Sequence, residues 1–273
     1  MKNTTIPQFR QKVLRHYKKE GRHTLPWRKT RNAYRILVSE IMLQQTQVDR
    51  VIPKYKAFIS RFPTVKVLAR APLADVLTYW SGLGYNRRAI YLKRLAEAVV
   101  RDYNGVIPLD ITTLQSLPGI GPYTARAVAT FSKDVPYIFI ETNIRSVFIH
   151  EFFPHTKKVE DKDLVPYIEK ALLKKSPREW YWALMDYGSY LKKTKKNPSR
   201  TSASYTKQST FKGSVREVRG ALLKYCTSGG TRDLQQFYKN NPSFERERVQ
   251  KALTGLVKEK ILDSDLERYV KIM

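Results

Sequence analysis

Apolar residues recur at helical spacing along most of the first 191 positions, and no stretch among them alternates as a β-strand would. Short segments containing Pro or Gly separate these stretches. The pattern predicts helices at residues 34–47, 53–61, 73–80, 87–103, 112–117, 124–132, 143–152, 161–173 and 177–191. Residues 1–191 are therefore expected to form an all-α domain.

The next segment, residues 192–209, is rich in Lys, Ser and Thr and contains almost no aliphatic side chain. Such a composition favours a basic linker, because it offers little apolar surface to bury. A chain of 273 residues also commonly holds more than one domain. The linker is thus the expected domain boundary.

Residues 210–273 are predicted to form a second, small α+β domain. Helical spacing covers residues 214–226, 231–240 and 244–259, and residues 261–272 alternate around an Asp-Ser-Asp turn, as a β-hairpin does. Three helices and a terminal hairpin suggest a winged helix. Its third helix then carries the candidate groove contacts Glu245, Arg246, Arg248, Gln250 and Lys251. A protein-binding winged helix is an equally good interpretation, because glutamates dilute the positive charge of this helix.

The charge balance changes the picture most. Lys and Arg number 51 against 24 Asp and Glu, giving a formal net charge of +27. An excess of that size favours a polyanionic partner, and nucleic acid is the usual one. No apolar run approaches the ~18 residues of a membrane-spanning helix. The sequence therefore predicts a soluble, intracellular nucleic-acid-binding protein, cytoplasmic or nucleoid-associated, with no membrane partner and a monomeric state.

The cysteine count excludes several chemistries. The single cysteine, Cys226, permits neither an intrachain disulfide nor a set of thiolate metal ligands. Its place on the apolar side of a predicted helix favours a packed thiol over a nucleophile.

Residues 117–125, Leu-Pro-Gly-Ile-Gly-Pro-Tyr-Thr-Ala, indicate a tight turn followed by a helix. Gly119 and Gly121 are expected to allow positive φ and close approach of the backbone to a partner. From Thr124 onward the spacing is helical, so helix N-terminal amides would face a DNA phosphate. A helix corner with a glycine cap is the alternative interpretation. The net charge favours the phosphate.

Several motifs together resemble those of the helix-hairpin-helix DNA glycosylase superfamily, and specifically its MutY-type adenine DNA glycosylase branch. They are Leu-Pro-Trp-Arg at 25–28, Val-Ser-Glu-Ile-Met-Leu-Gln-Gln-Thr-Gln-Val at 38–48, Gly-Leu-Gly-Tyr at 82–85, Leu-Pro-Gly-Ile-Gly at 117–121, and Ala-Leu-Met-Asp-Tyr-Gly at 183–188. The resemblance covers residues 1 to about 191 and implies a six-helix barrel joined to a second helical subdomain built from both ends of the domain. It also implies that double-stranded DNA with a mismatched or damaged base pair binds in the cleft between them.

The resemblance implies that Glu40 is the general acid. Adenine is a poor anionic leaving group, so it must be protonated while positive charge grows on the sugar. A helical glutamate is more often solvated than catalytic. Here the neighbours Val38, Ile41, Met42 and Leu43 are apolar, which predicts burial and a raised pKa for Glu40.

The second carboxylate departs from the family pattern, which has aspartate where this chain has Glu141. The longer side chain keeps the charge but moves it by roughly one methylene, which can change rates greatly. Three outcomes follow: a backbone shift restores the position, activity is weakened, or the protein binds without cutting. We favour the first, because an apolar segment precedes Glu141. The alternative is a glutamate that only caps the following helix.

The resemblance assigns further roles one residue at a time. Tyr123 replaces the Schiff-base lysine of bifunctional relatives of the endonuclease III type, which predicts base hydrolysis without an efficient lyase step. Asn143 matches a polar residue near the reacting sugar. The base-pocket positions are Trp27, Arg28, Leu43 and Asp186. The positions that probe or wedge beside the opposite base are Gln45, Thr46, Leu83 and Tyr85.

Two family features are missing from the sequence. Most relatives carry four cysteines after the position of Leu191 that hold an iron-sulfur cluster, and this chain has Lys, Ser and Thr there. We therefore expect no iron-sulfur cluster and no other cofactor or metal. The family's C-terminal oxoguanine-sensing domain is also absent, with the winged-helix-like region in its place.

The sequence thus predicts a monofunctional DNA glycosylase that flips and hydrolyses a mismatched base, adenine opposite 8-oxoguanine or guanine. The alternatives are a glycosylase for another base, such as thymine opposite guanine or hypoxanthine, and a catalytically weak mismatch-binding protein.

Overall fold

The computed structural model describes residues 4–195, 197–207, 210–227 and 229–273, which divide into two compact units. The first unit contains residues 4–40, 109–116, 120–195 and 197–207, and the second contains 41–108, 117–119, 210–227 and 229–273. The first unit therefore joins the N-terminal segment to the segment after the glycine turn. A helical subdomain made from both ends of residues 1–191 was predicted from the family resemblance.

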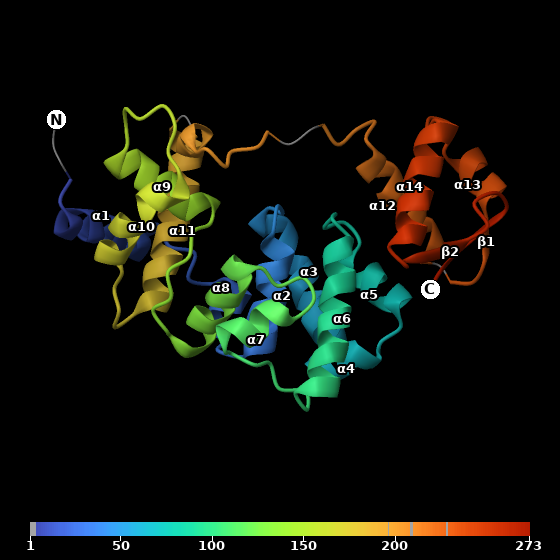
Figure 1. Ribbon diagram of the computed structural model, residues 1–273, viewed down its shortest axis with the longest axis horizontal. Coiled ribbons are helices and arrows are strands. Elements are labelled where there is room, and N and C mark those ends of the chain that lie inside the picture. Colours follow the sequence, from blue (N-terminus) through green and yellow to red (C-terminus); the bar gives the residue numbers. More distant parts are fainter. Residues whose placement is uncertain (1–3, 196, 208–209, 228) are drawn as a thin grey trace. The chain divides into compact units, whose positions relative to one another are not determined.

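Within its described residues, the regular elements of the first unit are helices, joined by loops (Figure 1). Its elements are α1 (Ile6–Glu20), η1 (Pro26–Lys29), the first part of α2 (Ala33–Leu43), α7 (Ile111–Ser116), α8 (Pro122–Lys133), α9 (Thr142–Phe152), α10 (Asp161–Ala171), α11 (Pro177–Thr194) and η2 (Pro198–Thr201). Phe9 lies at its centre, with ring centroids 5.1 Å from Phe148 and 5.8 Å from Trp180. These aromatic contacts tie α1, α9 and α11 together.

Helix α1 was not among the predicted helices, although its sequence signals it. Thr5 and Gln8 form a capping box at its N-terminus. Phe9, Val13 and Tyr17 are buried at intervals of four residues along one face. A stripe of only three apolar residues among many charged ones is a weak periodic signal, and tertiary packing completes it.

The second unit begins with the end of α2 and continues through α3 (Val48–Arg61), α4 (Val65–Arg70), α5 (Leu73–Trp80) and α6 (Arg87–Asp102). Helix α4 was not predicted, and α3 begins five residues before its predicted start at Pro53. The proline is tolerated because α3 packs firmly through Val51, Tyr55 and Phe58. Helix α2 ends four residues before its predicted end at 47, since Gln45 adopts a left-handed conformation with φ of 54°.

The C-terminal part of the second unit is a small α+β region, as predicted. Helices α12 (Val215–Cys226), α13 (Leu234–Asn240) and α14 (Arg246–Lys258) precede the hairpin of β2 (Leu262–Ser264) and β3 (Tyr269–Ile272). A third strand, β1 (Arg232–Asp233), pairs antiparallel with β3 and gives the order β1-β3-β2. Residues 232 and 233 were predicted to be helical. Asp233 instead caps α13 by accepting from the Gln235 amide at 2.8 Å.

Part of the predicted linker is folded. Asn197 caps η2, and the backbone around Val159 pairs with residues 201–203 through the bonds Val159 N to Thr201 O at 2.9 Å and Ala203 N to Val159 O at 2.8 Å. Polar side chains that suit a linker also suit caps and turns, which explains why composition alone missed this segment. The domain boundary itself stays a prediction, and residues 196, 208 and 209 of this segment lie outside the described part.

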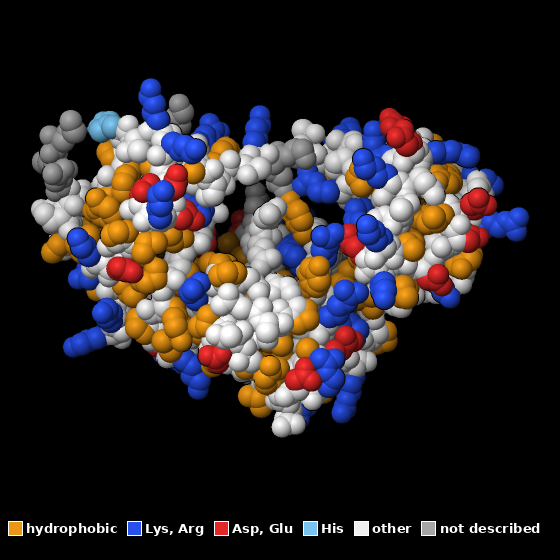
Figure 2. Space-filling model, in the orientation of Figure 1, with side chains coloured by type: hydrophobic (Ala, Val, Ile, Leu, Met, Phe, Trp, Pro, Cys, Tyr) orange, Lys and Arg blue, Asp and Glu red, His pale blue; other side chains and the backbone are white. Residues whose placement is uncertain are grey.

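Cys226 is 1% exposed, and burial raises the pKa of its thiol to about 12, which agrees with a packed side chain. Figure 2 shows Lys and Arg side chains spread over the visible face of both units. Among the described residues, no helix is both long and apolar enough to cross a membrane.

Candidate active site

Glu40 lies in a helix that is buried on nearly every side. Residues 36–42 of α2 are all buried, and Glu40 itself is 6% exposed. Its Oε2 accepts a hydrogen bond of 2.8 Å from the hydroxyl of Tyr123. A carboxyl group in such surroundings needs a partner, and Tyr123 supplies it.

Burial raises the pKa of Glu40 to about 7. The hydrogen bond from Tyr123 and the charge of Arg28 act in the opposite direction, and the negative charge of Glu141 adds to the increase. Glu40 is thus poised to hold a proton near neutral pH, which is the state that a general acid requires.

The glycine turn directly precedes α8, and Tyr123 is the second residue of that helix. Gly119 has φ of 78°, and a Cβ there would lie 2.7 Å from the Cβ of Tyr91, so both conformation and space require glycine. Gly121 was expected to share the positive φ, but its φ is −92° and it forms the N-cap of α8. No atom lies within 4 Å of a Cβ built at Gly121, so this cap faces open space.

Thr124 is 3% exposed, so its side chain faces the interior of the first unit. A DNA contact at this residue would have to be made by the backbone. The predicted contacts of Gly119, Gly121 and Thr124 with phosphate stay predictions.

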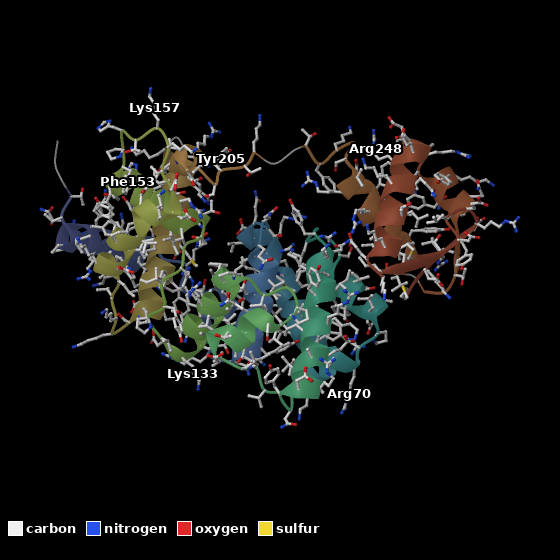
Figure 3. All side chains as sticks on the ribbon, viewed as in Figure 1. Arg70, Lys133, Phe153, Lys157, Tyr205 and Arg248 are labelled. Carbon is white, nitrogen blue, oxygen red and sulfur yellow. The ribbon has the colours of Figure 1, made fainter. Side chains whose placement is uncertain are left out.

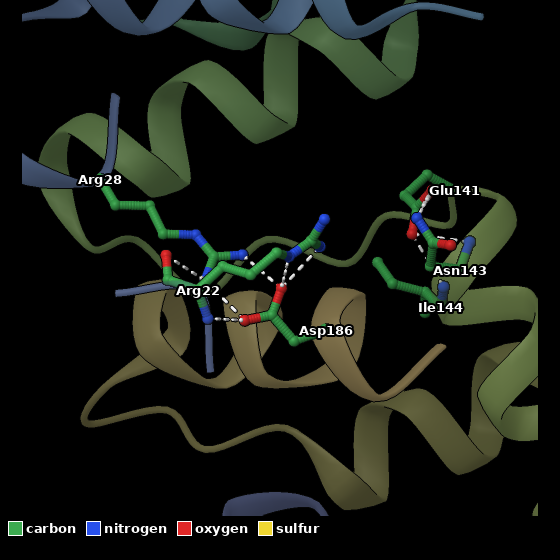
Figure 4. Close-up of polar contacts among 6 residues, drawn as sticks. All are labelled: Arg22, Arg28, Glu141, Asn143, Ile144 and Asp186. Carbon is green, nitrogen blue, oxygen red and sulfur yellow. Dashed lines mark hydrogen bonds and ion pairs between the residues drawn. The ribbon is translucent and has the colours of Figure 1, made fainter. Parts of the chain in front are cut away.

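Glu141 is the N-cap of α9 and serves as a triple hydrogen-bond acceptor (Figure 4). Its Oε1 accepts from the amides of Asn143 at 2.7 Å and Ile144 at 2.9 Å, and its Oε2 accepts from Asn143 Nδ2 at 3.1 Å. Glu141 therefore caps α9, and whether capping is its only role stays untested. A role at the sugar stays compatible with it, because the cap fixes the position of the carboxylate.

Gly188 of α11 is the last residue of the motif at 183–188, and packing requires a glycine there. A Cβ at this position would lie 2.3 Å from the backbone oxygen of Asn143, a separation that real side chains do not tolerate. The missing side chain lets α11 pack directly against the start of α9. Gly188 thereby supports the segment that carries Glu141 and Asn143.

Arg28 and Asp186, both predicted for the base pocket, bind each other. Arg28 Nη1 and Nη2 donate to the two oxygens of Asp186 at 2.7 and 2.8 Å, and Arg22 adds bonds from its amide and Nε (Figure 4). Burial alone raises the pKa of Asp186, but the bonds from Arg28 and Arg22 outweigh it and lower that pKa. The pair is a rigid, charge-assisted clamp, and its contact with a base stays a prediction.

The other two base-pocket positions differ in exposure. Trp27 is 6% exposed and sits in η1, whereas Leu43 at the end of α2 is half-buried. A pocket of about 430 Å³ opens beside Arg28, lined also by Arg178 and Trp182. Glu40 does not line this pocket, so we assign the pocket no catalytic role.

The residues predicted to contact the opposite base lie on two turns of the second unit that Arg88 holds together. Arg88 Nη1 donates to the carbonyls of Ile41, Met42 and Gln44 at 2.6 to 2.9 Å. Its Nη2 donates to Thr46 Oγ1 and to the carbonyl of Gly84, both at 3.0 Å. Burial lowers the pKa of Arg88 to about 10, and the group stays charged at neutral pH.

The two predicted wedge residues differ in accessibility. Leu83 is 3% exposed, so its side chain packs in the interior, and its role beside the opposite base stays a prediction. Tyr85 is half-buried and adopts a left-handed conformation with φ of 49°. Gln45 is exposed, and Thr46 also approaches the Leu83 carbonyl at 3.3 Å. Gln45 and Tyr85 are thus more accessible than Leu83, and their contact with a base stays a prediction.

Sequence reasoning missed Arg88 and the bond between Tyr123 and Glu40. Arg88 follows the Gly-Leu-Gly-Tyr motif by three residues, and only its proximity to that motif distinguished it from other arginines of this basic chain. Tyr123 was noted for the lysine that it replaces. Its partner lies 83 positions away, which a one-dimensional pattern does not reveal.

The expected absence of an iron-sulfur cluster stays a prediction. The full sequence holds one cysteine, and that thiol is buried in α12 with a raised pKa. A cluster needs a set of thiolates, so no step of the chemistry passes through it.

Comparison with known proteins agrees with this geometry. Residues 38–173 match the family described as HhH-GPD superfamily base excision DNA repair protein, and over this span the chain belongs to that superfamily. The adenine DNA glycosylase of Buchnera aphidicola subsp. Baizongia pistaciae is 40% identical over 166 residues, which are 61% of this chain and 45% of that protein. The adenine DNA glycosylase of Mycolicibacterium smegmatis is 45% identical over 149 residues, which are 53% of this chain and 51% of that protein.

The chain therefore spans about half the length of the curated relatives that it matches. A solved structure described as a thermostable thymine-DNA glycosylase matches with a TM-score of 0.61 and 25% identity, covering 71% of this chain and 91% of that one. The family resemblance and the predicted fold class are confirmed.

Proposed function

We propose that this protein is a monofunctional DNA glycosylase that extrudes adenine opposite 8-oxoguanine or guanine from double-stranded DNA and hydrolyses its N-glycosidic bond. The observation that carries the proposal is Glu40, a buried carboxyl with a pKa of about 7 held on the Tyr123 hydroxyl. The names of the curated relatives support adenine as the base. The net charge of +27 supports DNA as the partner.

The proposed reaction uses the two carboxyl groups differently. Neutral Glu40 gives its proton to a ring nitrogen of adenine while the bond from the base to C1′ breaks. The negative charge of Glu141 stabilises the positive charge that develops on the sugar. Water then adds its hydroxyl to C1′ and releases a proton, and adenine leaves as a neutral base.

Tyr123 completes this scheme by binding the Glu40 carboxylate that remains after the transfer. No amine stands at position 123 to form a Schiff base, so the proposed product is an intact abasic strand. The protein is proposed to act without a metal or cofactor.

A second candidate is removal of thymine opposite guanine, which the solved thymine-DNA glycosylase structure favours. A third is mismatch binding without efficient cleavage, which the glutamate at position 141 favours, since capping accounts for its hydrogen bonds.

A base-release assay under single-turnover conditions separates the three candidates. The duplexes carry adenine opposite 8-oxoguanine, adenine opposite guanine, thymine opposite guanine, or hypoxanthine. We expect the first two to be cleaved fastest, without strand scission before alkali treatment. Faster release of thymine would replace the proposed substrate. Tight binding with no release from any duplex would leave only the mismatch binder.

A further inference from the structure

Tyr85 stands in a turn whose conformation is unusual for its side chain. Gly82, Gly84 and Tyr85 all have positive φ, of 90°, 74° and 49°. Glycine adopts such angles freely, whereas a left-handed tyrosine is uncommon and costs of order 1–2 kcal/mol. The surrounding contacts must therefore hold Tyr85 in place.

Two arginines provide those contacts. Arg88 of α6 lies with its guanidinium 5.4 Å from the centre of the Tyr85 ring, and Arg216 lies 5.9 Å from it. Arg216 Nη1 also donates to the Tyr85 hydroxyl at 3.0 Å. Arg216 belongs to α12, so the C-terminal region fixes the end of this side chain.

Glu259 anchors the C-terminal region to the helix that follows the turn. Its carboxylate accepts from Arg219 of α12 at 2.7 Å and from Arg87 of α6. Its backbone oxygen accepts from Arg94 of α6 at 3.2 Å. Burial raises the pKa of Glu259, but the bonds from Arg87 and Arg219 outweigh it and lower that pKa. Glu259 thus joins α14, α12 and α6.

A half-buried aromatic ring that two guanidinium groups hold in place is suited to stacking on a nucleobase. Arg88 also links this turn to the turn that carries Gln45 and Thr46. The polar donors and acceptors of one turn and the ring of the other therefore belong to one structural assembly. Arg216 completes that assembly from the C-terminal region.

We propose that Arg216 of α12 positions Tyr85 for its contact with the base opposite the excised one, so that loss of Arg216 weakens opposite-base discrimination. This inference rests on the proposed glycosylase function. It gives a role in base discrimination to α12, whereas the sequence named the third helix, α14, as a candidate groove reader with protein binding as an equal alternative. Arg216 acts through Tyr85 and is therefore a positioning residue.

Binding discrimination tests this proposal without depending on base release. In a Glu40→Gln background, we would measure dissociation constants for duplexes with adenine opposite 8-oxoguanine, guanine and thymine. Arg216→Gln, Tyr85→Phe and the double variant are compared with a charge-matched control, Arg70→Gln. Arg70 is an exposed residue at the end of α4 (Figure 3), with no role in either site.

We expect Arg216→Gln to reduce the preference for 8-oxoguanine over thymine about tenfold, which corresponds to one charge-assisted hydrogen bond. Tyr85→Phe should have a similar effect, and the double variant should add little to either, because both remove the same contact. Arg70→Gln should change the affinity for all duplexes alike. When the same substitutions are made in the protein that keeps Glu40, rates of base release should show the same loss of preference.

Three results would overturn the proposal: equal weakening on every duplex by Arg216→Gln, additive effects of the two single variants, or no preference in the parent protein. Thermal unfolding checks that each variant folds, and Tyr85→Phe keeps the test valid if Arg216→Gln does not. Retained discrimination with no base release from the Glu40 protein would reject the glycosylase proposal and leave this inference standing.

Discussion

Glu40 and Glu141 are the same residue type in opposite environments. Glu40 lies in the middle of a buried helix, with a tyrosine hydroxyl as its hydrogen-bond partner and a pKa of about 7. Glu141 lies at a helix N-terminus and accepts three N–H groups from Asn143 and Ile144. Burial around Glu40 favours the neutral carboxyl group. The N–H groups around Glu141 donate hydrogen bonds to a carboxylate that accepts them.

This difference shows how one unit can hold a carboxyl group with a raised pKa and a hydrogen-bonded carboxylate, the two groups that the proposed reaction requires. The longer side chain of Glu141 does not disorder it, because two backbone amides fix one of its oxygens. Its other oxygen, Oε2, accepts from Asn143 Nδ2, and substitution of Glu141 tests whether the carboxylate also stabilises positive charge on the sugar.

Removal of the Glu40 proton donor should have the largest effect. Glu40→Gln keeps the shape of the side chain but cannot transfer a proton, so single-turnover base release should fall by roughly 10³-fold. Affinity for the mismatched duplex should stay within a few-fold of the parent protein. Unchanged base release would mean that another group is the acid.

Changes at Glu141 should be next in size. Glu141→Gln removes the charge and should lower base release by about 10²-fold, while loss of cap strength costs about 1 kcal/mol of stability. Glu141→Asp keeps the charge and can still cap the helix, so it should retain or improve activity. Rates measured at saturating DNA, beside unfolding curves, separate the two roles. Equal rates in all three proteins would assign Glu141 to structure alone.

Gly188→Ala should disturb the support of Glu141. The added Cβ would overlap the backbone oxygen of Asn143, and we expect a loss of about 1–3 kcal/mol in the free energy of unfolding. Gly220→Ala in α12 is the matched control, because no atom lies within 4 Å of its Cβ. That change should stabilise the protein by up to about 1 kcal/mol through helix propensity. Similar effects of both changes would refute the packing argument.

The pH dependence should show the smallest but most specific effect. Because Glu40 must be protonated to act, base release should fall as pH rises through about 7. The Tyr123 hydrogen bond lowers this pKa, so Tyr123→Phe should move the falling limb to higher pH. The stability contributed by protonated Glu40 is lost as pH rises from its ordinary pKa of 4.5 through about 7. A limb that moves to lower pH would contradict the assignment.

The sequence predicted the helical domain and the burial of Glu40 because both follow from local apolar spacing. Helix α5 has its predicted bounds, and the terminal hairpin forms within the predicted residues. Helix α1 was missed because its apolar stripe is short, although the Thr5–Gln8 capping box was readable.

Long-range contacts explain what the sequence could not predict. Arg216 meets Tyr85 across 131 positions, and Arg88 reaches Ile41 across 47. In a chain with 51 Lys and Arg, no pattern separates these two arginines from the solvated ones. The pairing of Val159 with residues 201–203 was hidden for a related reason, since backbone bonds leave no trace in side-chain composition.

The bonds of Arg88 also determine how its two turns respond to thermal motion. One guanidinium binds carbonyls at the end of α2 and the carbonyl of Gly84, so neither turn can open without breaking bonds that belong to the other. Their backbone amides should therefore exchange with solvent deuterium as one cooperative group. The two turns are then expected to open and close together. A mutation that loosens the turn at Gln45 should also shorten the time that Tyr85 spends in its left-handed conformation.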